Sequence, residues 1–220
     1  MKDKIIIFGT GSFAEVVYYY FEHESNYKVI AFCADSSYIN KSKFLNLPLV
    51  SFEKIEKKYP PSKYKMFIAV GYKKNNKIRS QIFYKIKRKG YKLISYIYPS
   101  VKIWPNNKIG ENTFIFENNT IQPFVEIGNN VILWSGNHIG HHSKIEDHCF
   151  ITSHVVISGN CRVGNHVFIG VNATLRNNIS IGNHCIIGAG SLIMKSTKNK
   201  ELYVAPKTVR DPRSVDQINL

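Results

Sequence analysis

Histidines are the residues of this chain whose type and spacing best suit catalysis. Five of the eight lie between positions 138 and 154. An imidazole has an unperturbed pKa of about 6.5, so it can accept a proton and release it again near neutral pH. His141 and His142 follow Ile139-Gly140, where the repeat described below predicts a corner between two strands. His141 is therefore a candidate general base, and the alternative is a histidine exposed at a turn.

Three other histidines raise the question of a metal site. His148, His166 and His184 recur at every eighteenth position, and imidazole is a common zinc ligand. In the repeat fold predicted below, this spacing stacks them in one column with a step of about 4.8 Å. A straight column does not converge on one tetrahedral ion, and the four cysteines show no C-x2-C spacing. We expect exposed repeat positions here and no metal.

A glycine-rich turn near the start is a candidate phosphate-binding site. The apolar run Lys4–Phe8 predicts a buried strand, followed by Gly9-Thr10-Gly11-Ser12 and a helix to about His23. A strand, a glycine-rich turn and a helix N-terminus form an arrangement that binds phosphate groups. Asp35 follows the next predicted strand, where an acidic residue often contacts a ribose or base. The alternative is that the glycines only serve the turn.

A six-residue period predicts the element that carries the histidines. From Ile103 to Ile193 every sixth residue is Ile, Leu or Val, at 16 successive positions. The residue two places before each is uncharged and nearly always small, and glycine follows the large residue seven times. A helix cannot keep a six-residue stripe on one face, whereas a parallel β-helix with three hexads per coil can. Cys149, Cys161 and Cys185 fall on the small inward position and are read as core residues.

The first hundred residues predict a small α/β domain. Further strands are expected at Lys28–Ala34, Pro48–Ser51, Met66–Gly71 and Tyr91–Tyr98, with helices at Phe52–Tyr59 and Asn75–Lys89. Alternating strands and helices indicate a parallel sheet of the Rossmann-like kind, too short for a full dinucleotide fold. The expected domains are 1–98, 99–197 and a C-terminal tail, 198–220.

Composition narrows the possible partners. No stretch approaches 18 apolar residues and the start has no signal-peptide pattern, so we expect a cytoplasmic protein without membrane insertion. The formal net charge of +15 is uneven, with 19 basic and 7 acidic residues in positions 1–100. A basic surface favours anionic partners, although a general enrichment in Lys, Asn and Ile is an equally simple explanation.

Both halves together resemble one family, the bacterial sugar O- and N-acyltransferases that join a nucleotide-sugar-binding α/β domain to a left-handed β-helix. The matching segments are GTGSFAEVV near the start, AVGYKKNNKIR (69–79), YPS (98–100), IGHHSKI (139–145), SHVVISG (153–159) and FIGVNATL (168–175). Studied N-acetyltransferases of this family modify UDP-, GDP- or dTDP-linked 4-amino-4,6-dideoxy sugars for surface glycans. The resemblance also implies the left hand of the helix and a homotrimer.

The resemblance assigns roles to individual residues. It makes His141 the general base, while His142 stands where many relatives carry Asp or Glu, so what orients His141 is open. Residues expected at the nucleotide-sugar site are Gly9, Thr10, Gly11, Ser12, Asp35, Gly71, Asn137 and His154. Residues expected at the acetyl-CoA site are Gly159, Val171, Ala173 and Lys207.

The expected function is therefore acetyl-CoA-dependent N-acetylation of a nucleotide-linked 4-amino-4,6-dideoxy sugar, without nucleic acid or metal. O-acetylation of a sugar hydroxyl needs the same base and the same donor, and it stays open. A non-catalytic β-helix that serves binding or assembly is the alternative outside enzymes.

Overall fold

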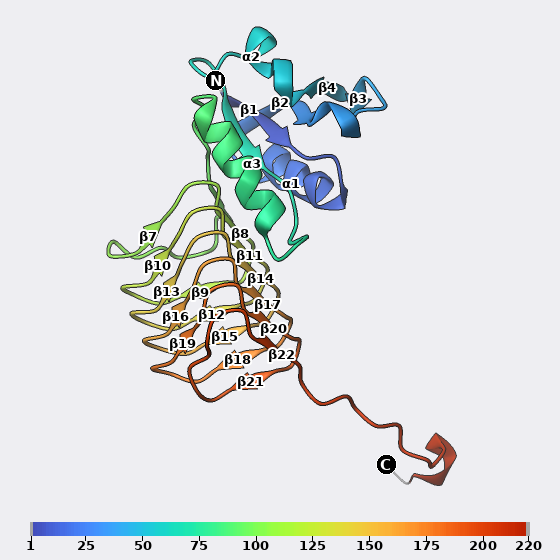
Figure 1. Cartoon of the computed structure of the whole chain (residues 1–220), viewed down its shortest axis with the longest axis vertical. Coiled ribbons are helices and arrows are strands. Elements are labelled where there is room, and N and C mark those ends of the chain that lie inside the picture. The colour runs from blue at the N-terminus through green and yellow to red at the C-terminus, as the bar shows by residue number, and fades with distance from the viewer. Residues whose placement is uncertain (1, 219–220) are drawn as a thin grey trace.

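The computed structural model describes residues 2–218 and consists of an α/β domain seated on one end of a β-helix (Figure 1). An extended C-terminal segment leaves the other end of the β-helix and carries the short helix η3 (Val215–Gln217). None of the helices in the described part of the chain is long and apolar enough to cross a membrane.

The α/β domain contains the predicted parallel sheet. Its strand order is β3-β4-β2-β1-β5, and every pair is parallel except the β3–β4 hairpin, which was not predicted. The strands are β1 (Asp3–Phe8), β2 (Tyr27–Ala34), β3 (Lys43–Phe44), β4 (Leu47–Ser51) and β5 (Lys65–Ile68).

Helices cover both faces of this sheet. On one face, α1 (Ser12–His23) buries Ala14, Val17 and Phe21 against the strands. On the other face lie η2 (Phe52–Lys54), α2 (Ile55–Lys58) and α3 (Lys77–Arg88), which share a second apolar cluster. A short η1 (Ser36–Tyr38) follows β2.

The strand predicted at Tyr91–Tyr98 is wrong as part of this sheet. Leu93 makes only an isolated bridge to Met66, and the regular strand is limited to β6 (Tyr96–Ile97). β6 pairs with β8 of the β-helix, so this segment is the passage between the two folds. The domain limits at residues 98 and 197 remain predictions.

The hexad repeat folds into a left-handed parallel β-helix with three sheets of two-residue strands. Paired strands lie three hexads apart in the sequence, as in Ile127 opposite Ile145, so three hexads make one coil as predicted. The charged sheet contains β7 (Lys108–Ile109), β10 (Glu126–Ile127), β13 (Lys144–Ile145), β16 (Arg162–Val163) and β19 (Ser180–Ile181). The docking sheet contains β6, β8 (Phe114–Ile115), β11 (Ile132–Leu133), β14 (Phe150–Ile151), β17 (Phe168–Ile169), β20 (Ile186–Ile187) and β22 (Leu202–Tyr203). The open sheet contains β9 (Thr120–Ile121), β12 (His138–Ile139), β15 (Val156–Ile157), β18 (Thr174–Leu175) and β21 (Leu192–Ile193).

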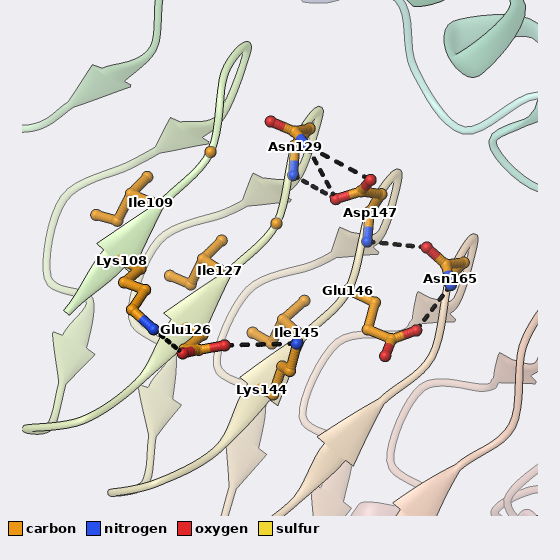
Figure 2. Close-up of a pocket in the computed structure, with 12 residues that line it drawn as sticks. Lys108, Ile109, Glu126, Ile127, Asn129, Lys144, Ile145, Glu146, Asp147 and Asn165 are labelled. Atoms are coloured by element: carbon orange, nitrogen blue, oxygen red, sulfur yellow. Dashed lines mark hydrogen bonds and ion pairs between the residues drawn. The ribbon is translucent and has the colours of Figure 1, made fainter.

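The first residue of each two-residue strand points outward and distinguishes the three sheets. On the charged sheet Glu126 lies between Lys108 and Lys144 and pairs with both (Figure 2). On the docking sheet the outward residues include Phe114 and Phe150, which pack against α1, β1 and β5 of the α/β domain. These apolar outward residues explain why the α/β domain sits on this sheet.

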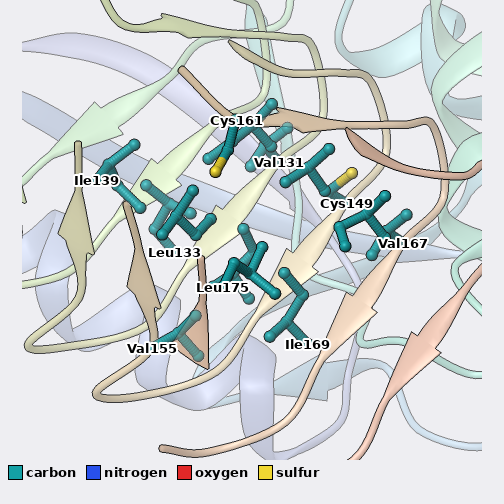
Figure 3. Close-up of a cluster of buried hydrophobic side chains, with 14 of the residues drawn as sticks. Val131, Leu133, Ile139, Cys149, Val155, Cys161, Val167, Ile169 and Leu175 are labelled. Atoms are coloured by element: carbon teal, nitrogen blue, oxygen red, sulfur yellow. The ribbon is translucent and has the colours of Figure 1, made fainter. Parts of the chain in front are cut away.

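The inward residues fill the β-helix as the period predicts (Figure 3). From Ile115 to Ile193 every large inward residue is buried, and Cys149, Cys161 and Cys185 lie among them. Ile103 is an exception to the predicted stripe, because 36% of its surface is exposed. The segment 102–107 forms a loop rather than a strand, so the regular stripe starts one hexad later.

The corners between sheets recur once per coil. The first corner follows the docking sheet (134–136, 152–154, 170–172), the second follows the open sheet (122–124, 140–142, 158–160), and the third follows the charged sheet (128–130, 146–148, 164–166, 182–184). The last residue of each corner named here has a positive φ between 57° and 76°. Asn, His and Gly tolerate this conformation better than other residues, which explains the many histidines in the repeat.

Arg79 of α3 fastens the α/β domain to the third corner. Its side chain is fully buried and its Nη2 donates to the carbonyl oxygens of Asn130, His148 and Cys149 at 2.9 to 3.2 Å. Its Nη1 donates to Gly71 O at 3.3 Å. One side chain thus ties the loop after β5 to two successive coils.

Candidate active site

His141 stands exposed on the second corner, where its backbone and ring are both held. Its N–H donates to Gln122 Oε1 at 2.8 Å, and its Nδ1 lies 3.1 Å from Nδ1 of His142. In such a pair one nitrogen must donate and the other accept. If His141 donates through Nδ1, its Nε2 carries the free lone pair that a general base needs.

Phe124 supports this pair from the preceding coil, 18 residues before His142. Its ring stacks on His142 with centroids 4.5 Å apart and planes 23° apart, and 47% of its surface stays exposed. Its φ is +66°, at a corner position that is Asn, His or Gly in the other coils. A bulky residue in this conformation is strained, and such strain tends to mark functional sites. Phe124 was not among the residues predicted from the sequence, although the hexad repeat places it at a corner.

Gly159 lies at the same corner as His141, in the next coil along the chain. A β-carbon at this position would lie 2.7 Å from Cε1 and Nε2 of the His141 ring. The glycine therefore leaves space over the edge of the ring that bears Nε2. A small group is required here for contact with His141, whatever reaction the site performs.

Gly159→Ala is expected to lower any activity that depends on His141 by roughly 10- to 100-fold, because the ring must move by a fraction of an ångström to 1 Å. Gly159 does not have a positive φ, so alanine is compatible with the backbone and the melting temperature should change little. Steady-state rates and thermal melts check both parts. Asn177→Ala, at an exposed residue one coil further along the same corner, is the matched control. Full activity in Gly159→Ala would show that this edge of His141 is not used.

The candidate nucleotide-sugar residues of the α/β domain do come together. Phe8, at the end of β1, pairs with Cys33 of β2 and with Ile68 of β5. The residues that follow these strands, including Gly9–Ser12, Asp35 and Gly71, therefore share one edge of the sheet. Gly9 has φ +130°, and a β-carbon there would lie 2.5 Å from Ala69 O, so this turn requires glycine. Ligands of parallel α/β sheets bind at this edge.

The remaining candidates lie in the interior of the β-helix, on its first corner or in the extended C-terminal segment. Asn137 is 1% exposed, and its amide bonds Asn119 Oδ1 and Val155 N inside the coil. Ala173 is also fully buried on an inward position. His154 and Val171 lie on the first corner, and Lys207 lies in the exposed extended segment. We therefore leave the side chains of Asn137 and Ala173 out of the proposed site.

Within one chain, His141 does not meet the sheet edge that would hold a nucleotide sugar. Phe13 at the start of α1 packs on Trp134 of the first corner, whereas His141 is on the second corner. The two corners are separated by one strand of the open sheet, roughly 15 Å of extended chain. Two cavities of the described chain lie elsewhere. One, of about 520 Å³, covers the charged sheet (Figure 2), and one of about 450 Å³ lies beside Asp3, Tyr27 and Tyr96.

The column of histidines at the third corner is packed rather than exposed, contrary to the prediction. The rings of His148, His166 and His184 stack with centroids 4.8 and 4.6 Å apart. His148 accepts at Nδ1 from the Asn130 amide at 2.9 Å and faces Tyr84 Oη with Nε2 at 3.2 Å. Within residues 2–218 no three His, Cys, Asp or Glu side chains are grouped to hold a metal ion.

Burial controls the protonation of this column. Loss of water contact, followed by repulsion from the neighbouring ring, lowers the pKa of His148 and of His166 to about 4. Burial, followed by repulsion from the charges of Lys77 and Lys200, also lowers the pKa of His184. These histidines are therefore neutral in the folded protein at neutral pH.

The free energy of unfolding is expected to fall as the pH drops from about 6.5 towards 4. In this pH range the histidines bind protons in the unfolded chain but stay neutral in the folded column, where their pKa is lower. Acid therefore favours unfolding. For the fully buried His148 the effect is about 2 kcal/mol at pH 5, and the half-buried His166 adds less. Denaturant titrations at pH 7.5 and 5 measure it. His148→Asn, which places at this corner the residue found at Asn130, should flatten the dependence; equal slopes in both proteins would contradict the account.

Two family comparisons match the chain. Residues 4–86 match the PglD N-terminal domain, and residues 108–141, 124–159 and 160–195 match the bacterial transferase hexapeptide (six repeats). A comparison with curated proteins gave no match.

Solved structures share the complete architecture. The acetyltransferase domain of PglB from Neisseria gonorrhoeae FA1090 is 23% identical with a TM-score of 0.81, over 91% of this chain and 95% of that one. A mutant of perosamine N-acetyltransferase from Caulobacter crescentus, in complex with CoA and GDP-perosamine, is 22% identical with a TM-score of 0.82, over 90% and 92%. WeeI from Acinetobacter baumannii AYE is 20% identical with a TM-score of 0.68, over 90% and 94%. At these identities the likeness shows the fold alone.

Proposed function

Because the chain belongs to the bacterial proteins that join a PglD N-terminal domain to transferase hexapeptide repeats, we propose that it is an acetyl-CoA-dependent N-acetyltransferase of a nucleotide-linked amino sugar. The observation that carries this proposal is the His141 ring, which is exposed, is bonded through Nδ1 and is left open at Nε2 by Gly159. The similar perosamine enzyme was solved with CoA and GDP-perosamine, and the PglB domain with acetyl coenzyme A.

His141 would act as the general base. As the sugar amine attacks the thioester carbon, the N–C bond forms, the C–S bond breaks, and His141 Nε2 takes the amine proton. That proton then neutralises the CoA thiolate as it leaves. The backbone N–H of Gly159, next to the ring, is a suitable donor to the carbonyl oxygen as negative charge develops.

His142 would orient the base in place of a carboxylate. In this role its Nδ1, 3.1 Å away, would accept the Nδ1–H of His141, and the stacked Phe124 would hold its ring in that position. A neutral acceptor fixes the tautomer of His141 as a carboxylate would, but it adds no negative charge beside the imidazolium that forms.

The α/β domain would hold the nucleotide sugar at the edge formed by Gly9–Ser12, Asp35 and Gly71. Backbone N–H groups at the start of α1 suit the diphosphate, and Asp35 suits a ribose or base. The acetyl-CoA arm would run past Gly159, Val171 and Lys207, and His154 would border the sugar.

A second copy of the chain would complete the site. His141 lies on the second corner, whereas the nucleotide-sugar edge of the α/β domain lies beside the first corner. The open sheet between these two corners has no charged outward residue. Val156 and Leu192 on that sheet are 38% and 64% exposed. Packing of neighbouring copies across this surface, as in a homotrimer, would bring His141 of one copy to the sheet edge of the next.

A thiol-release assay tests the proposal. Acetyl-CoA is offered with UDP-, dTDP- and GDP-linked 4-amino-4,6-dideoxy sugars and with the matching hydroxyl sugars. Turnover with an amino sugar supports the proposal. Turnover only with a hydroxyl sugar would make the protein an O-acetyltransferase, and no turnover with either class would favour a non-catalytic β-helix.

A further inference from the structure

Nearly all of the net charge of this chain is confined to one short segment. Residues 54–92 contain 14 Lys and Arg but only one acidic residue, Glu56. The rest of the chain contains 16 basic and 14 acidic residues, which nearly balance. A general enrichment in lysine would affect the whole chain, so it does not explain this distribution.

The fold spreads this segment over one face of the α/β domain. α2, α3 and the connections beside them cover the sheet face opposite α1, and their apolar residues form one buried cluster (Figure 1). Its members include Ile55, Tyr59, Ile82, Phe83 and Ile86. With the apolar residues turned inward, the lysines of this layer point to solvent, and we call this surface the basic layer.

Most charges of the basic layer have no acidic neighbour. The nearby carboxylates are already engaged. Glu56 pairs with Lys89, Glu111 with Lys87, Asp35 with Lys85 and Asp3 with Lys65, while Glu53 accepts from Ser36 and Ser51. Within the described residues, nine exposed basic side chains of the layer have no carboxylate within salt-bridge distance: Lys54, Lys57, Lys58, Lys63, Lys73, Lys74, Lys77, Arg88 and Lys92. Such a one-sided surface is complementary to an extended anionic one.

The composition of the layer favours an anionic lipid surface over nucleic acid. Eight of the nine unpaired groups are lysines, which act as point charges and lack the forked donors of arginine. Nucleic-acid surfaces add arginines and aromatic platforms for stacking, whereas the exposed aromatic residue of α3, Tyr84, is engaged with His148. The two cavities described above lie outside the layer, so neither of them offers it an enclosed site for a small anionic ligand.

We propose that the basic layer binds the protein peripherally to bilayers that contain anionic phospholipid. Each lysine held near such a surface contributes about 1 kcal/mol, so four or five contacts give useful affinity. Apart from Tyr84, which is engaged with His148, the exposed residues of α3, such as Lys77, Gln81, Lys85 and Arg88, offer no apolar anchor for insertion. The attraction should therefore depend steeply on salt, because it is screened beyond about 10 Å at 0.1 M ionic strength. The proposal does not depend on the acetyltransferase activity.

Vesicle co-sedimentation tests it with the full chain. The vesicles are phosphatidylcholine alone or with about a third phosphatidylglycerol, at about 0.1 M and 0.5 M salt. The layer variant carries Lys57→Gln, Lys58→Gln, Lys77→Gln and Arg88→Gln. The control variant has the same loss of charge outside the layer, at the exposed Lys41, Lys102, Lys195 and Lys198.

We expect binding only to anionic vesicles at low salt, weakened at least about tenfold in the layer variant and kept in the control. Absence of binding, or equal loss in both variants, would overturn the proposal. A second experiment measures binding of the same proteins to single-stranded RNA by fluorescence anisotropy at the same salt concentrations. Layer-dependent binding to RNA that is tighter than binding to vesicles would assign the surface to nucleic acid instead.

Discussion

His141→Asn is expected to lower kcat by about 10²- to 10⁴-fold, the range that a positioned general base contributes. The change removes Nε2 from the edge that Gly159 leaves open, and asparagine cannot accept the amine proton near neutral pH. Because His141 is exposed on a corner, the free energy of unfolding should change by less than about 0.5 kcal/mol. Single-turnover rates and denaturant titrations measure the two effects.

His23→Asn, at an exposed histidine at the end of α1, is the matched control and should keep full activity. Variants of His142 separate orientation from base chemistry. His142→Ala should cost about tenfold, because the Nδ1–H of His141 loses its acceptor. His142→Asn should recover part of this, since asparagine suits a positive φ and offers a carbonyl oxygen. A His141→Asn protein with undiminished kcat would remove His141 from the mechanism.

Arg79→Met is expected to lower the free energy of unfolding by about 2 to 5 kcal/mol. The guanidinium is the hydrogen-bond partner of the Asn130 and His148 carbonyl oxygens, and their loss leaves two buried acceptors unsatisfied. Burial lowers the pKa of Arg79 to about 9, so keeping a cation here is costly, and relief of that cost offsets part of the loss. Methionine retains most of the packing volume, which limits the effect to the polar contacts.

Urea denaturation of Arg79→Met and of Lys77→Met, an exposed position on the same helix, gives the comparison. Lys77→Met should stay within about 0.5 kcal/mol of the parent. Arg79→Lys should be intermediate, because one ammonium cannot reach all of the corner carbonyls and Gly71 together. Equal stability of Arg79→Met and the parent would show that the two folds are held together by apolar packing alone.

The sequence predicted the β-helix because its signal is repeated many times. The inward residues of the coils are read independently, so one irregular position such as Ile103 does not disturb the whole pattern. The outward residues carry a second period, of three hexads, on which none of the predictions was based. Phe114, Ile132 and Phe150 are apolar where the charged sheet has Lys108, Glu126 and Lys144, and this column identifies the face covered by the α/β domain.

The site could be predicted only in part. The hexad register alone assigns the side chains of Asn137 and Ala173 to the interior, where they lie, whereas only the resemblance selects these residues for the site; their part in binding stays a prediction. The stacked His148 column and the Arg79 contacts depend on how α3 lies against the third corner, which no local pattern specifies. Phe124 could have been found, because it is a bulky residue at a corner position otherwise filled by Asn, His or Gly.

The chemical identity of the product tests the central claim most directly. The protein is incubated with acetyl-CoA and a nucleotide-linked amino sugar, and the product is analysed by mass spectrometry before and after treatment with hydroxylamine, which cleaves esters and spares amides. The account predicts a sugar that gains one acetyl group and keeps it after treatment, and that is not formed by His141→Asn. Loss of the acetyl group on treatment would identify an ester and contradict N-acetylation. Failure to form any acetylated sugar from the panel would contradict the proposed enzyme altogether.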